Sequence, residues 1–91
     1  MVTEVLLWPL IGEVLAAFEE QKKPLPFTDK WRAVAHATVI PSSVYEEMAD
    51  ELTLHLQVIK IYTLEPALRG KALMLIGMLS FTAALARENG L

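Results

Sequence analysis

The sequence predicts an all-α fold, a single small domain of four helices in which the apolar C-terminal helix is central. Apolar residues recur along the chain at steps of three and four, which is the period of an amphipathic helix. Prolines and capping residues divide this pattern into four segments, and 91 residues are enough for one domain but not for two. One helical domain is therefore expected over residues 1–91, with helices at about residues 3–23, 29–39, 44–63 and 66–89.

The first two segments are delimited by prolines. Pro9 lies inside the first segment, so we expect either a kink near Trp8 or a helix that starts at Pro9 itself. Pro24 begins the clearest loop of the chain, because proline cannot continue the helix before it. The second segment has Thr28 as its expected N-cap and is ended by Pro41.

The third segment contains a pattern that fits two structures. Residues 52–58 alternate between apolar and polar, which is typical of a strand. Leu52 and Leu56 also share one face of a helix. We favour a helix that continues to about residue 63, because neither Gly nor Pro interrupts it and a lone strand would lack a partner. The alternative is an α+β fold with a strand at about residues 52–62.

The fourth segment opens at Pro66, closes at Gly90, and is apolar almost all the way round. Such a helix should be buried on every side, and three partner helices of modest length do not wrap it completely. A homodimer or higher oligomer is therefore expected. The residues of this helix either belong to the domain's own core or form a face for a second copy or another protein. The candidates for that interface are Met74, Gly77, Met78, Ser80, Phe81, Ala84 and Leu85.

Charge and composition exclude several classes of function. Eight Lys and Arg against eleven Asp and Glu give a net charge of -3, whereas a general nucleic-acid or anionic-membrane binder needs excess positive charge. The absence of cysteine excludes disulfides, thiolate nucleophiles, zinc fingers and iron–sulfur clusters. The longest uncharged run, residues 72–86, is shorter than the roughly 18–20 residues of a membrane span. A cytoplasmic protein without membrane association is expected.

Few residues of the sequence are typical of a catalytic or metal-binding site. The two histidines, His36 and His55, form no spacing typical of a nucleophilic or acid–base site, so we predict no enzyme activity, no cofactor and no metal in a single copy. Glu47, Glu51 and His55 are four residues apart in turn and share one helical face. In a two-fold pair, that face could present carboxylates and imidazoles to a metal. Metal binding therefore stays an alternative.

The stretch from Val39 to Tyr45 resembles the turn and the start of the recognition helix in helix-turn-helix repressors. The resemblance implies a dimeric DNA-binding regulator. Thr38 stands where that family prefers Gly, and four carboxylates follow in the helix that would face DNA phosphates. Nucleic acid is therefore not the favoured partner.

Two charged clusters flank the middle of the chain, and each is either ordinary solvated surface or part of a complementary contact between copies or with a partner. The basic cluster comprises Lys22, Lys23, Lys30 and Arg32, and the acidic cluster comprises Glu46, Glu47, Asp50 and Glu51.

The favoured function is a small non-enzymatic protein–protein interaction module, a regulator, adaptor or inhibitor that acts as a homo-oligomer and binds another protein. One alternative is a helix bundle that binds an apolar ligand or a metal. A second alternative is a helix-turn-helix-like DNA-binding regulator.

Overall fold

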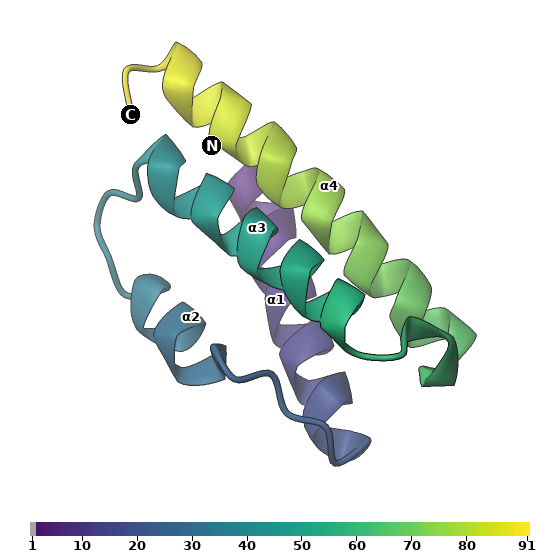
Figure 1. The fold of residues 1–91 in the computed structure, drawn as a ribbon. Helices are drawn as coiled ribbons and strands as arrows, with labels where there is room; N and C mark the ends of the chain where they lie inside the picture. The colour runs from purple at the N-terminus through teal and green to yellow at the C-terminus, as the bar shows by residue number, and fades with distance from the viewer. Residues whose placement is uncertain (1) are drawn as a thin grey trace.

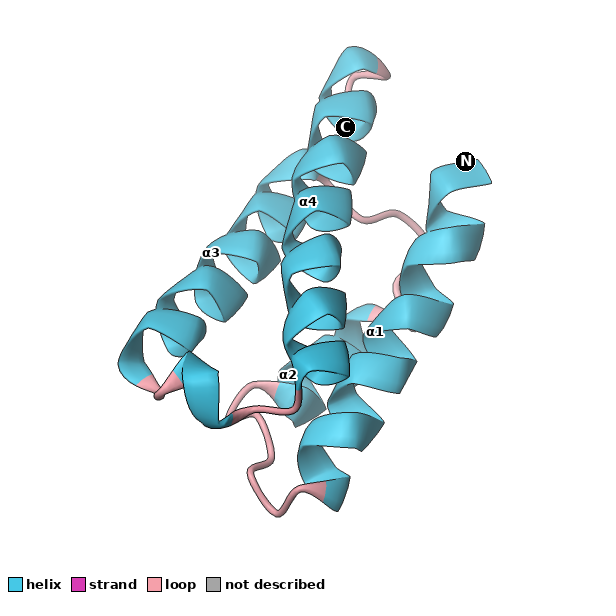
Figure 2. Ribbon diagram, turned by 90° about the vertical axis from the view of Figure 1, so that its right-hand side faces the viewer, coloured by secondary structure: helices cyan, strands magenta, loops and turns pink. Residues whose placement is uncertain are grey.

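The computed structural model describes residues 2–91, in which four α-helices and one short 3-10 helix follow one another (Figure 1). The elements are α1 (Val2–Glu20), α2 (Thr28–Val34), α3 (Ser42–Val58), η1 (Ile61–Thr63) and α4 (Pro66–Glu88). The described residues contain no strand (Figure 2), so the all-α prediction is confirmed and the α+β alternative is wrong.

The helix α4 contacts both of the other long helices. It runs antiparallel to α3, with which it makes the largest interface, and it packs against α1 on another side (Figures 1 and 2). The short helix α2 lies on the side of the molecule away from α4 (Figures 1 and 2). The whole domain measures 39 × 21 × 20 Å.

All four α-helices contribute to one contiguous apolar core. In the three long helices, its largest fully buried side chains recur at steps of three, four or seven residues, as an amphipathic pattern requires, and α2 contributes Trp31. They include Leu7, Val14, Leu15, Phe18, Trp31, Tyr45, Met48, Leu52, Leu75 and Leu79. The loop before α2 adds Leu25 and Phe27 to the same core.

The first helix is longer at its start and shorter at its end than predicted. It passes through Pro9 without interruption, so the alternative in which the helix starts at Pro9 is wrong. It ends at Glu20, where residue 23 was predicted, because Lys22 adopts a left-handed conformation with φ of 59°. The backbone N–H of Lys23 then donates to the Phe18 carbonyl at 3.0 Å, which closes the helix end in a Schellman motif.

The second and third helices also end earlier than predicted. The second ends at Val34, where residue 39 was predicted, because the segment that follows is solvent-exposed and has no core to pack against. The third ends at Val58, where residue 63 was predicted, because Ile59 is extended with ψ of 159°. After Ile59 the chain reverses its direction through η1. As a result, Leu64 enters the core and α4 runs back along α3.

The fourth helix agrees with its prediction to within one residue. Pro66 occupies its first turn, and it ends at Glu88. Gly90 has a φ of 77°, and the Leu91 N–H donates to the Ala86 carbonyl at 2.8 Å, which is a second Schellman motif.

Candidate interaction surface

The helix α4 buries only one of its faces. Seven residues of that face lie in the core and meet α1 and α3: Leu68, Ala72, Leu75, Leu79, Thr82, Ala83 and Ala86. On the opposite side, Leu73, Met74 and Phe81 expose 55%, 58% and 58% of their surface. A single copy therefore leaves one side of α4 uncovered, as expected for a helix with three partner helices of modest length.

The exposed side of α4 is uncharged along four turns. We define the α4 face as Leu73, Met74, Gly77, Ser80, Phe81 and Ala84, all of which are exposed. No charged residue occurs between Lys71 and Arg87. A solvated helix normally carries charges on its outer side, and apolar patches of this kind on monomers usually mark interaction sites.

The seven interface residues predicted from the sequence all lie outside the buried core. Five of them are exposed, while Met78 and Leu85 are partly buried at the edge of the α4 face. The prediction omitted Leu73, which the structure places on the same face. The spacing of seven residues between Leu73 and Ser80, which places both on one side of a helix, was the signal that could have found it.

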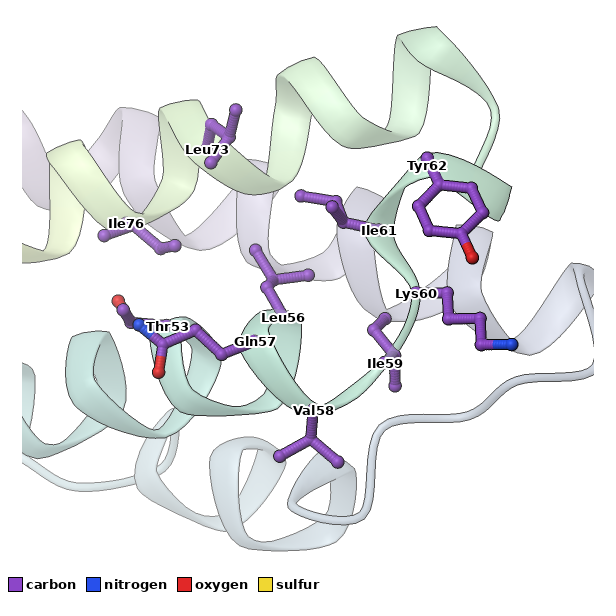
Figure 3. Close-up of a pocket in the computed structure, with 10 residues that line it drawn as sticks. All are labelled: Thr53, Leu56, Gln57, Val58, Ile59, Lys60, Ile61, Tyr62, Leu73 and Ile76. Carbon is purple, nitrogen blue, oxygen red and sulfur yellow. The ribbon is translucent and has the colours of Figure 1, made fainter.

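A groove lies next to the α4 face, where α3 ends and the chain returns through η1 (Figure 3). Its volume is about 640 Å³, and Leu56 and Ile61 point between the two helices near Leu73 and Ile76 (Figure 3). The ammonium group of Lys60 points away from this aliphatic cluster (Figure 3). Leu73 belongs to both the groove and the α4 face, so the two form one continuous apolar surface.

By length and composition alone, α4 would also qualify as a membrane-crossing helix. One third of its most apolar stretch is buried within the domain. The remaining part of that stretch includes the α4 face, whose apolar side chains are exposed.

The two predicted charged clusters meet within one copy. Lys30 on α2 binds Glu47 at 2.7 Å and Glu51 at 3.1 Å on α3, and these two hydrogen bonds raise the pKa of Lys30. Arg32 binds Glu19 on α1 at 3.0 Å. These pairs connect α2 to its neighbours, so much of the basic and acidic charge already has an intramolecular partner.

The remaining members of the clusters are distributed over the surface. Glu46 pairs with Arg87 of α4, and Asp50 lines a shallow recess with Ser80 beside the α4 face. Lys23 donates to the Thr63 hydroxyl at 3.2 Å, and Lys22 occupies the left-handed end of α1.

The face of α3 that carries Glu47, Glu51 and His55 packs against α2 and the loop before it. Glu47 and Glu51 both contact Lys30, and Glu51 also accepts a hydrogen bond from the indole nitrogen of Trp31 at 3.4 Å. His55 is turned toward the ring of Phe27, with 5.9 Å between the ring centroids. Among residues 2–91 there is no group of three His, Asp or Glu side chains that could hold a metal ion.

The segment that resembles a helix-turn-helix differs from that motif in its connection. The third helix does begin at Ser42, within the resembling stretch. The connection from α2 comprises residues 35–41, whereas the motif joins its helices by about three or four residues. The exposed side of the α3 start carries Glu46, Glu47 and Asp50.

Comparison with protein-family models, curated proteins and solved structures finds no match to this chain. The residues and their geometry are therefore the basis for assigning a function. Among the features described, the α4 face and the adjoining groove combine three exposed large apolar side chains with an aliphatic groove.

The partly buried His55 predicts that the stability of the domain depends on pH. Its ring is partly buried against Phe27, and this burial lowers its pKa below the usual 6.5. The unfolded chain therefore binds a proton more readily than the folded chain, and stability is lost as pH falls below about 6.5. We expect the urea midpoint to be constant from pH 8 to 7 and to fall between pH 6.5 and 5.5.

The matched variants for this measurement are His55→Gln and His36→Gln. The first should flatten the pH dependence in that range, whereas the second should preserve it because His36 is exposed. A dependence that survives in His55→Gln would assign the effect to another group.

Proposed function

We propose that this protein is a small non-enzymatic interaction module that associates with a second copy of itself through the α4 face. The single observation that carries this proposal is the uncharged exposed side of α4, where Leu73, Met74 and Phe81 are each more than half exposed. Removing such surface from water is favourable by about 25 cal/mol per Å² of apolar area. A second copy supplies an identical surface.

The α4 face would supply the centre of such an interface. Three large side chains that are slightly more than half exposed offer about 100 Å² each, or about 300 Å² per copy. A specific interface buries roughly 800 Å² per partner, so the small residues of the α4 face, its partly buried edge and the adjoining groove must contribute the rest.

The charged residues support an interaction role and not a catalytic one. Glu47 and Glu51, the carboxylates that share a helical face with His55, are bound to Lys30. His36 is exposed, and His55 lies edge-on to Phe27. The groove and the α4 face, by contrast, consist mainly of side chains that bind by apolar contact.

The test is the mass in solution by light scattering after size exclusion, over a dilution series. We expect twice the chain mass of 10.1 kDa for the wild type and 10.1 kDa for Phe81→Glu. By symmetry, Phe81→Glu places two unpaired carboxylates in the interface and should raise the dissociation constant by at least about 100-fold.

Val39→Glu is the matched control, because Val39 has the same 58% exposure as Phe81 but lies in the loop between α2 and α3. It should leave the dimer intact. A wild-type protein that stays at 10.1 kDa at every concentration would contradict self-association. The groove would then become the favoured site for an apolar ligand, because its volume and aliphatic lining fit such a molecule.

A further inference from the structure

We propose that the groove beside η1 binds the alkyl chain of a single-chain anionic amphiphile, such as a fatty acid, and that Lys60 holds its negative head group. This inference goes beyond the proposed self-association and does not depend on it, because Leu73 is the one residue that the groove shares with the α4 face. It follows from the exposed apolar segment at the groove, from the other residues that line it, and from the charge beside it.

The segment that connects α3 to α4 is hydrophobic but not buried. Residues 58–63 read Val-Ile-Lys-Ile-Tyr-Thr, and none of them is buried. Ile59 and Ile61 are partly buried against the core, whereas Val58 and Tyr62 expose 76% and 69% of their surface. The core therefore accounts for only part of this apolar surface. A contiguous group of exposed apolar side chains usually marks a binding site.

This segment lines the groove together with α3 and α4. Leu56 and Ile61 point between the two helices near Leu73 and Ile76 (Figure 3). The groove volume of about 640 Å³ lies within the range of roughly 300–1,000 Å³ that is typical of sites for small molecules. The groove thus has the size and the aliphatic lining that an alkyl chain requires.

The lining favours an alkyl chain over a peptide. The Thr53 hydroxyl donates its hydrogen to the Ala49 carbonyl at 2.7 Å, so this donor is used within α3. Gln57, Lys60 and Tyr62 are the other lining residues with hydrogen-bonding side chains. A peptide backbone requires a partner for each N–H and C=O group that becomes buried, whereas an alkyl chain requires none.

Lys60 gives the groove a positive charge without an internal counter-charge. No carboxylate is among the residues that line the groove, and Lys60 forms no ion pair within residues 2–91. A second ammonium group lies at η1, where Lys23 donates to the Thr63 hydroxyl at 3.2 Å. Glu65, the acidic residue nearest to Lys60 in the sequence, lines a different recess. By contrast, four other cationic side chains each pair with a carboxylate: Lys30, Arg32, Lys71 and Arg87.

The position of this charge fits an amphiphile and not a purely apolar ligand. The ammonium group of Lys60 points away from the aliphatic cluster (Figure 3). A lysine side chain keeps its charge in water while its stem lies along apolar surface. An alkyl chain in the groove can therefore place its head group in solvent beside this ammonium group, which attracts an anion and repels a cation.

The test is a calorimetric titration of the full chain with dodecanoate below its micelle-forming concentration. We expect saturable binding of one molecule per chain. Dodecyltrimethylammonium has the same chain and the opposite charge, and it should bind about 10-fold more weakly. Hexanoate should bind at least about 100-fold more weakly, because each buried CH₂ strengthens binding about fourfold. Binding without saturation, or equal binding of dodecanoate and dodecyltrimethylammonium, would overturn the inference.

Two pairs of variants test the location of the site. Ile61→Glu changes a lining residue in η1, which contains no buried residue, and should lower the affinity for dodecanoate at least about 10-fold. Val5→Glu, at an exposed position of α1 outside the groove, should have no effect. Lys60→Gln should weaken binding about threefold, whereas Lys22→Gln, at an exposed lysine outside the groove, should not. Equal effects within either pair would contradict the proposed site.

Two further measurements separate this inference from a membrane surface and from self-association. Sedimentation with phosphatidylglycerol vesicles, without one-to-one binding of dodecanoate, would overturn it in favour of a membrane surface. Phe81→Glu should bind dodecanoate as the wild type does, because Phe81 does not line the groove. Absence of dodecanoate binding would overturn this inference alone, since self-association is tested separately by the mass in solution.

Discussion

Trp31→Ala is expected to lower the free energy of unfolding by about 4 kcal/mol. The Trp31 side chain is fully buried, and its ring lies 4.6 Å from that of Phe27, measured between centroids. Its indole nitrogen also donates to Glu51. Truncation removes the main contact of a helix of only seven residues and opens a cavity in the core.

Chemical denaturation followed by far-ultraviolet circular dichroism measures this change. Because a domain of this size has a total stability of about 5–14 kcal/mol, the variant should unfold at much lower denaturant concentration. Trp8→Ala is the control, since Trp8 is only partly buried and should cost clearly less. Equal losses in the two variants would show that α2 is not anchored by Trp31.

Leu52→Ala is expected to cost about 3 kcal/mol, and Leu54→Ala less than about 0.5 kcal/mol. Leu52 is fully buried, while Leu54, two positions later in α3, is 62% exposed. In a helix these two positions point in nearly opposite directions, whereas in a strand they would share a face. Similar losses for the two variants, measured by the same denaturation, would contradict the helical register of α3.

The alternation of residues 52–58 shows why sequence pattern alone left this region open. The leucines at 52 and 56 fit both periods, so only the environment of Leu54 distinguishes them. Contacts with α4 decide the outcome, because the antiparallel helix buries Leu52 and Leu56 and leaves Leu54 in solvent. The boundaries set by Pro66 and Gly90 were predictable, since each follows from the preferences of one residue.

The candidate surface was only partly predictable for a related reason. The sequence shows that α4 is apolar all the way round, but not which side faces α1 and α3. That choice depends on residues far away in the chain, such as Phe18 and Tyr45, which fill the core beside Leu75 and Leu79. The pairing of Lys30 with Glu47 and Glu51 was likewise hidden, because it requires the position of α2 across α3.

The left-handed end of α1 reveals a competition between local preference and burial. This conformation costs a residue with a Cβ about 1–2 kcal/mol, and Lys22 has no side-chain property that reduces the cost. The turn carries Leu25 and Phe27 into the core, and burying each of them contributes about 1.5–3 kcal/mol. Burial of these two side chains therefore outweighs the strain at Lys22. The end of the first helix is therefore set by the burial of two side chains in the loop that follows it, and not by the preferences of the helix's own residues.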